Sequence, residues 1–134
     1  MNKVIWITGA SSGIGKALAL KFAREGWQVA ASARRVELLD EMSNSNENIS
    51  SFPLDVNMKD KCKEIFEQIK NKYENVDICF FSTGTWDPKK EKDIDMEQIE
   101  KTFKINFFGT LNCIKAVEEY FKNKKSGQIS IVSS

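Results

Sequence analysis

The chain has 134 residues, of which 41% are hydrophobic and 29% charged, a composition typical of one folded domain rather than of a disordered or membrane-spanning chain. Lys and Arg number 20 against 19 Asp and Glu, so the formal charge of +1 gives no field that would attract nucleic acid or an anionic membrane. Histidine is absent and Cys62, Cys79 and Cys113 are widely spaced, which argues against a metal site or Cys/His catalysis and predicts free buried thiols.

The first predicted element is a buried strand over residues 3–7, which runs directly into a glycine-rich turn, Thr8 to Gly15. Apolar residues at helical spacing then predict a helix from Ile14, and Gly26 stands where such a helix would end. Small residues over 29–33 predict the second strand. The chain therefore opens as strand, glycine turn, helix and strand.

A short helix is expected from Arg34 through Met42, followed by a polar loop over 43–46. The third strand is predicted over 49–54, with Pro53 interrupting it near its end. A helix marked by one apolar face follows over 62–73.

The fourth strand is predicted over 77–81, and its nearly continuous apolar character is typical of a strand covered on both faces. A turn at Ser82 to Gly84 and a charged loop over 86–93 lead to one long helix over 96–123. The fifth strand is predicted over 128–132.

The long helix carries apolar residues on two sides. One stripe contains Ile99, Phe103, Phe107, Leu111, Ile114, Val117 and Phe121. A second face contains Ile105, Phe108, Ala116 and Tyr120. A helix of this kind covers the sheet with one face and needs a further helix or a partner subunit for the other, so we expect a homo-oligomer formed through 96–123.

Strands that alternate with helices predict a parallel sheet with right-handed crossovers. We therefore expect an α/β fold of the Rossmann type, a doubly wound sheet of about five strands in the order 3-2-1-4-5, which forms a single nucleotide-binding domain over 1–134 and is truncated after the fifth strand. Ligands of such sheets bind beyond the carboxyl ends of the strands. The features that follow predicted strand ends are the glycine turn, Arg34, Asp55, Gly84 and Ser134.

Gly9, Gly13 and Gly15 lie between a strand and a helix, where a turn without Cβ atoms lets backbone N–H groups approach a pyrophosphate at the positive end of the helix. A merely tight turn is the alternative interpretation. The spacing, Gly-x3-Gly-x-Gly within TGASSGIG, resembles the glycine motif of the short-chain dehydrogenase/reductase family.

Four further segments resemble motifs of that family in the same order along the chain: Leu54-Asp55-Val56, Phe81-Ser82-Thr83-Gly84, Ile105-Asn106-Phe107-Phe108-Gly109-Thr110 and Ile131-Val132-Ser133-Ser134. The second segment departs from the family's Asn-Asn-Ala-Gly, because Phe81 and Ser82 replace the two asparagines and Thr83 replaces the alanine. The asparagine-based stabilisation of the sheet centre is thus missing from the sequence.

The glycine turn and the resemblance together predict a set of cofactor-binding residues. They are Thr8, Gly9, Ser11, Ser12, Gly13, Ile14, Gly15, Arg34, Arg35, Asp55, Val56 and Gly84. At the position where a dinucleotide site usually offers a carboxylate to the ribose, this chain has Arg34 and Arg35, which favours the 2'-phosphate of NADP over NAD. NAD remains possible, and a solvated basic start of a helix is the alternative interpretation.

The resemblance implies two catalytic residues: Asn106, which would hold a water of a proton relay, and Ser134, which would polarise the substrate carbonyl. Ser133 takes that place if the register shifts by one residue. Asn106 is otherwise an exposed or locally bonded asparagine, and Asp55 is otherwise the N-cap of the helix that begins near Met58.

The family's remaining pair, a Tyr-x3-Lys, is expected after the serine, and the chain stops at Ser134. Tyr120 and Lys124 satisfy the spacing, but they precede the serine strand, so we predict that they lie at the surface, far from the cofactor. The resemblance thus implies hydride transfer between a nicotinamide and a small carbonyl or alcohol substrate. We expect the 134 residues alone to bind nucleotide weakly and not to turn over.

Two other functions stay open, a stand-alone nucleotide-binding or association module and a flavodoxin-like module. The N-terminus lacks the apolar run of a secretory signal, and about 18 consecutive apolar residues occur nowhere. We therefore expect a cytoplasmic protein with neither membrane nor nucleic acid as partner.

Overall fold

The computed structural model describes residues 2–84 and 94–133. The elements in chain order are β1 (Val4–Thr8), α1 (Gly13–Arg24), β2 (Gln28–Ser32), α2 (Val36–Ser45), β3 (Ile49–Ser51), α3 (Lys59–Tyr73), β4 (Ile78–Phe81), α4 (Met96–Phe103), the π-helical segment η2 (Lys104–Gly109), α5 (Thr110–Lys124) and β5 (Gln128–Ile131).

The five strands form one parallel sheet in the order β3-β2-β1-β4-β5, which confirms the predicted Rossmann-type fold. Strand β1 lies in the centre and pairs with β2 on one side and β4 on the other, so that Ile5 stands opposite both Val29 and Ile78. All five strands therefore end at the same edge of the sheet, which is where ligands of such folds bind.

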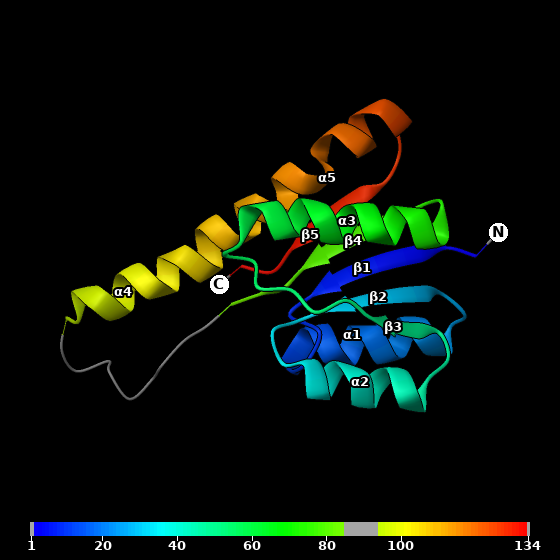
Figure 1. The fold of residues 1–134 in the computed structure, drawn as a ribbon, viewed down its shortest axis with the longest axis horizontal. Coiled ribbons are helices and arrows are strands. Elements are labelled where there is room, and N and C mark those ends of the chain that lie inside the picture. The colour runs from blue at the N-terminus through cyan, green and yellow to red at the C-terminus, as the bar shows by residue number, and fades with distance from the viewer. Residues whose placement is uncertain (1, 85–93, 134) are drawn as a thin grey trace.

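Helices cover both faces of the sheet (Figure 1). Helices α1 and α2 pack on one face, where Ile7, Ala19 and Leu39 belong to one buried cluster. Helices α3 and α5 pack on the other, where the Trp6 ring stacks on Phe66 with ring centroids 5.6 Å apart. Each face thus has its own apolar core.

Several predicted boundaries move, those of β3 and α2 among them. Strand β3 ends at Ser51, because Pro53 has no N–H to donate, although the backbone N–H groups of Phe52 and Leu54 still donate to Ala31 and Ala33 across it. Helix α2 runs to Ser45, so most of the loop predicted over 43–46 is helical.

The long helix predicted over 96–123 is a continuous helical path, but it is not one regular α-helix. The π-helical segment η2 interrupts it, and each π-type turn holds about one residue more than an α-turn. Compared with a regular α-helix of the same residues, this rotates α4 relative to α5 by about 100°, the angle of one residue. The predicted stripe is therefore not continuous.

The sheet-facing side of η2 and α5 consists of Ile105, Gly109, Cys113 and Val117, all buried. The other apolar side is exposed over α4, η2 and the start of α5, at Met96, Ile99, Phe103, Phe107, Phe108 and Leu111. The prediction that the helix has a second, uncovered apolar face is thus correct, but Ile105 belongs to the covered one.

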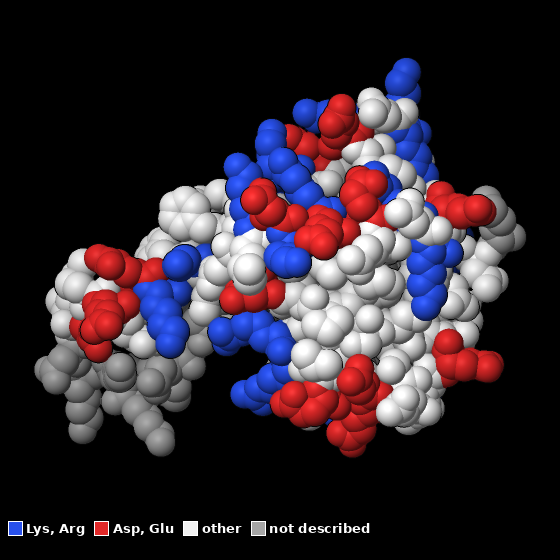
Figure 2. All heavy atoms as spheres, in the orientation of Figure 1, with Lys and Arg blue, Asp and Glu red and all other residues white. Residues whose placement is uncertain are grey.

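The three cysteines are free and buried, as predicted. On the face shown in Figure 2, Lys and Arg side chains are intermixed with Asp and Glu. Among the described residues, no helix combines the length and the apolar character that a crossing of the bilayer requires.

Candidate nucleotide-binding site

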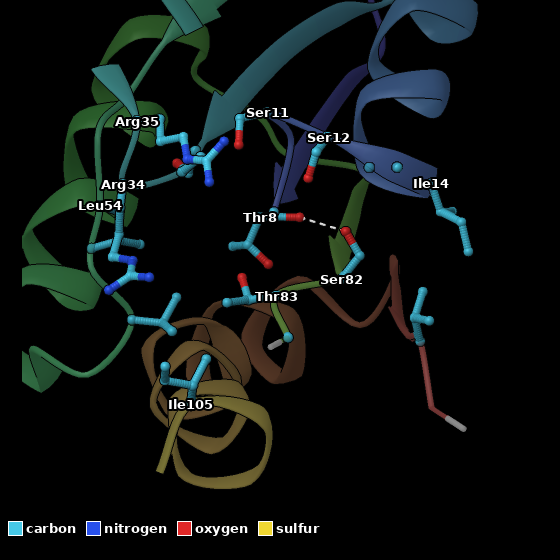
Figure 3. Close-up of a pocket in the computed structure, with 18 of the residues that line it drawn as sticks. Thr8, Ser11, Ser12, Ile14, Arg34, Arg35, Leu54, Ser82, Thr83 and Ile105 are labelled. Carbon is cyan, nitrogen blue, oxygen red and sulfur yellow. Dashed lines mark hydrogen bonds between the residues drawn. The ribbon is translucent and has the colours of Figure 1, made fainter. Parts of the chain in front are cut away.

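A cavity of about 370 Å³ lies at the carboxyl ends of β1, β2 and β4. It is lined by Thr8, Gly9, Ser11, Ser12, Gly13, Ile14, Gly15, Ser32, Ala33, Arg34, Arg35, Leu54, Asp55, Val56, Ser82, Thr83, Gly84, Ile105 and Val132. All twelve residues predicted to bind the cofactor are in this set. Figure 3 shows the two arginines at one end of the cavity and Ile14 at the other, with Thr8, Ser82 and Thr83 between them.

The glycine turn is a tight backbone cradle. Gly9 and Gly13 have φ values of +65° and +54°, which residues with a side chain rarely adopt. A Cβ atom at Gly15 would lie 2.2 Å from the carbonyl oxygen of Gly9, whereas a Cβ at Gly13 would meet no described heavy atom within 4 Å. The turn is therefore closed toward the protein at Gly15 and open toward the cavity at Gly13.

Helix α1 begins at this turn. Its N-cap, Ser12, is extended (φ −156°), and its side chain makes no capping hydrogen bond to the described part of the chain. The hydroxyls of Ser11 and Ser12 turn toward the cavity (Figure 3). First-turn N–H groups without an intrahelical partner, together with the helix dipole, suit an anionic group such as a pyrophosphate.

Ser82 occupies a position where the family carries asparagine, and it makes its own link between strands. Its hydroxyl donates a hydrogen bond of 2.7 Å to the carbonyl oxygen of Thr8, which joins the end of β4 to the end of β1. The stabilisation that the sequence left open is thus provided by a hydroxyl. A Cβ at Gly9 would lie 2.8 Å from the carbonyl oxygen of Ser82, so the same residue also closes the floor under the glycine turn.

The Thr8 hydroxyl oxygen is buried and has no hydrogen-bond partner in the described part of the chain. An unmet hydroxyl costs about 1–3 kcal/mol. The residues present therefore fit a dinucleotide at two points: a polar floor at Thr8 and an open glycine cradle beside a helix N-terminus.

Arg34 and Arg35 are exposed, between the end of β2 and the start of α2. Among the described lining residues, Asp55 is the one acidic side chain. Its carboxylate accepts a hydrogen bond of 3.0 Å from the backbone N–H of Asn57, and α3 begins only after Met58. The N-cap interpretation of Asp55 is therefore wrong, and the end of the cavity beside the arginines has a positive balance.

Asn106 lies in η2 and faces the turn after β4. A Cβ at Gly84 would stand 3.4 Å from the Asn106 Oδ1 atom, and the Asn106 carbonyl oxygen accepts a 2.9 Å hydrogen bond from the Thr110 hydroxyl. The residue is thus held beside the cavity by a locally bonded backbone, within an element that the sequence did not reveal.

The predicted serine lies outside the described residues. The chain reaches the cavity at Val132, whose N–H donates to the Phe81 carbonyl at 3.1 Å and continues the pairing of β5 with β4. Ser133 follows and is exposed. The catalytic role of Ser134 stays a prediction.

Tyr120 and Lys124 stand at the opposite end of the sheet, as predicted, but they are not free surface residues. The Tyr120 hydroxyl accepts a 2.9 Å hydrogen bond from the Val76 N–H, and the Lys124 ammonium donates one of 2.9 Å to the Val76 carbonyl. Lys124 also lies 3.8 Å from the Asp77 carboxylate. Tyr120 and Lys124 therefore hold α5 against the start of β4, and their role there is structural.

Seven lining residues are not among the cofactor-binding residues predicted from the sequence: Ser32, Ala33, Leu54, Ser82, Thr83, Ile105 and Val132. Six of them flank or end predicted strands, so the rule that ligands bind at strand ends could have found them. Ile105 has no such signal, because it reaches the cavity from a helix.

Comparison with known proteins agrees with this geometry. The family model described as short chain dehydrogenase matches residues 3–134. An uncharacterized oxidoreductase of Listeria monocytogenes, Lmo0432, is 39% identical over 138 residues, which cover 99% of this chain and 55% of the relative. An NADPH-dependent 1-acyldihydroxyacetone phosphate reductase of Schizosaccharomyces pombe is 32% identical over 98% of this chain and 45% of its own length.

Among solved structures, ElxO with NADP bound superposes with a TM-score of 0.90 at 28% identity, over 100% of this chain and 56% of that one. The chain thus spans about half the length of the curated relatives it matches.

Proposed function

Because the chain belongs to the short-chain dehydrogenase family, we propose that it supplies the nucleotide-binding half of an NADP(H)-dependent oxidoreductase acting on a carbonyl or alcohol substrate. The observation that carries the proposal is the cavity that joins the open glycine cradle at one end to two arginines at the other. A dinucleotide phosphate has anionic groups at two separated points, and this cavity offers positive potential at both.

In this proposal the N–H groups of the glycine turn and of the first turn of α1 hold the pyrophosphate. Arg34 and Arg35 hold the 2'-phosphate, for which a guanidinium is the best-matched partner. The ElxO structure contains NADP, and the S. pombe relative is named as NADPH-dependent, which supports the same preference here. When bound, the nicotinamide supplies or accepts the hydride.

Asn106 and Ser134 form part of the proposed catalytic side, with Asn106 orienting water and Ser134 polarising the substrate oxygen. The one Tyr-x3-Lys spacing within 1–134, Tyr120 and Lys124, anchors the opposite end of the sheet. We therefore do not expect residues 1–134 by themselves to transfer hydride.

Titration of the protein, as its gene encodes it, with NADPH and with NADH tests the proposal, using the change in nicotinamide fluorescence. We expect NADPH to bind at least about tenfold more tightly, since a charge-assisted contact to a phosphate contributes about 1.5–3 kcal/mol. Equal affinities for the two nucleotides would remove the role given to the arginines, and no binding of either would refute the proposed function.

We further propose that a second copy of this chain covers the exposed apolar stripe of α4 and η2. Phe103, Phe107 and Phe108 are 58%, 52% and 57% exposed, which is unusual for clustered aromatic side chains. A stripe of this kind on each of two copies can pair with itself about a twofold axis. Light scattering tests it, because a monomer at high concentration would exclude this interface.

A further inference from the structure

Val56 is held in place by α5, a helix that is distant from it in the sequence. Its side chain lines the nucleotide cavity and is only 5% exposed, and its carbonyl oxygen accepts a hydrogen bond of 2.9 Å from the side-chain amide of Asn112 in α5. The Cys62 thiol approaches the same oxygen at 3.6 Å. The backbone of the loop after β3 is thus tied to α5 directly behind the cavity wall.

The side chain of Val56 is held by the same helix face. A Cβ atom at Gly109 would lie only 2.6 Å from Val56 Cγ2, so the valine methyl occupies the space that a side chain at Gly109 would need. Gly109 precedes Asn112 by three residues, which places both on one side of a helix. Val56 is therefore fixed at its carbonyl by Asn112 and at its methyl by Gly109.

This contact lies at the end of the π-helical segment. Gly109 is the last residue of η2, Ile105 in the same segment lines the cavity, and Asn106 stands beside Gly84. Since π-type turns are energetically less favourable than α-turns, they persist where surrounding contacts hold them. Ile105, Asn106 and Gly109 thus belong to one short segment, which contacts the loop of Val56 at Gly109.

We propose that Asn112 is a positioning residue for the nucleotide site, acting through the carbonyl group of Val56. The contact of Gly109 with the Val56 side chain serves the same purpose. Asn112 does not itself line the cavity. The Asn112 amide keeps the loop of Asp55 and Val56 against α5, and the close packing of Gly109 on Val56 keeps η2 against the same loop. The role in nucleotide binding rests on the proposed function, whereas the coupling of the two segments does not.

Asn112→Ala in the protein as its gene encodes it tests the proposal. Asn123→Ala is the matched control, because it removes the same amide from the exposed far end of the same helix. We expect Asn112→Ala to weaken NADPH binding by about fivefold to tenfold, the effect of losing one hydrogen bond to a cavity residue, and Asn123→Ala to leave it unchanged. The titration is done well below the unfolding temperature, so that loss of folded protein does not contribute.

Gly109→Ala adds a second arm. We expect it to weaken binding, and the further change Val56→Ala to restore part of the loss, since alanine lacks the Cγ2 atom that the new methyl would meet. If the effects of the two substitutions on the free energy of NADPH binding simply add, the claim that these residues act together is overturned.

Amide hydrogen exchange separates this proposal from the proposed function. We expect Asn112→Ala to raise exchange about tenfold both in residues 54–58 and in 104–109, relative to Asn123→Ala. Unchanged exchange in 104–109 would refute the positioning role even if NADPH binds. A parent protein that bound no dinucleotide would refute the proposed function, and the exchange data would still decide whether Asn112 couples the two segments.

Discussion

The hydroxyl of Ser82 donates a 2.7 Å hydrogen bond to the carbonyl oxygen of Thr8, so the end of β4 is tied to the end of β1 beneath the glycine turn. The two residues are 74 positions apart in the chain. The link stabilises the meeting point of the two central strands, at which the cavity opens.

Ser82→Ala should lower the free energy of unfolding by about 0.5–1.5 kcal/mol, because the Thr8 carbonyl loses its hydroxyl donor. Urea denaturation followed by circular dichroism measures this. Ser43→Ala is the control: in the described part of the chain its hydroxyl donates to the Asp40 carbonyl within the same helix, and we expect a change within about 0.5 kcal/mol. Equal effects of the two substitutions would contradict the role of Ser82.

Gly15→Ala should disrupt the turn, since the new Cβ would lie 2.2 Å from the Gly9 carbonyl oxygen and 2.7 Å from the Ser82 hydroxyl. We expect a loss of more than about 2 kcal/mol in stability, together with loss of nucleotide binding. Gly84→Ala is the matched control, because its nearest described neighbour would be a side-chain oxygen at 3.4 Å, and we expect a change below about 1 kcal/mol. A stable Gly15→Ala variant would show that the backbone there can shift.

Much of this site follows from the sequence, because the carboxyl ends of parallel strands must meet at one edge. The sequence therefore predicts that the glycine turn after β1, Arg34 after β2 and Gly84 after β4 lie together, and all three line the cavity. Ile105 could not. Its position depends on a π-helical segment that the spacing of apolar residues does not reveal.

The reason lies in a tertiary contact. The apolar pattern over 96–123 fits a regular helix almost as well as an interrupted one, whereas the π-helical segment ends where Gly109 packs closely against Val56, a residue far away in the sequence. The sequence indicated two apolar faces correctly, but it grouped the exposed Phe103 with the buried Val117, and the buried Ile105 with the exposed Phe108. Periodicity reports on neighbours along the chain, not on those across the fold.

Arg34→Ala and Arg35→Ala, made separately, should show which guanidinium holds the 2'-phosphate. We expect at least one of them to raise the dissociation constant of NADPH by about tenfold to a hundredfold and to leave that of NADH nearly unchanged. Arg24→Ala, an exposed arginine in the last turn of α1, is the control for general charge. A parallel loss for both nucleotides would point to a role other than phosphate recognition.

Alkaline pH should destabilise the fold through Cys79. Burial raises the pKa of this thiol well above its ordinary value of 9.0, so the native state keeps a proton that the unfolded chain releases. The free energy of unfolding is therefore unaffected by this group below pH 9 and falls as the pH rises above it, by about 1.4 kcal/mol per pH unit.

Cys79→Ala should reduce that slope by the share of one thiol, as measured by denaturation under reducing conditions between pH 8 and 11. Ile69→Val, another fully buried position on the same face, should lower stability equally at each pH and leave the slope as it is. An unchanged slope in Cys79→Ala would assign the alkaline loss to other groups.

Phe103→Glu should dissociate the proposed oligomer, because it places a charge in the middle of the exposed apolar stripe. Sedimentation velocity checks this. Val36→Glu introduces the same charge at an apolar residue of α2 that is 42% exposed and lies away from the stripe, and it should leave the sedimentation coefficient unchanged. The same response to both substitutions would mean that α4 and η2 are not the interface.

The local helix geometry also depends on the number of residues in the π-helical segment. One extra residue within η2 is what separates its geometry from a regular α-helix, so deleting a single codon between Lys104 and Gly109 would let the helix run straight through. The orientation of α4 and of the aromatic stripe would be kept, because the π-type turn already absorbs that residue; a change of η2 to a regular α-helix without the deletion would instead turn them by about 100° relative to α5. A homologue with one residue fewer in this segment should accordingly have a regular α-helix here and the same orientation of α4.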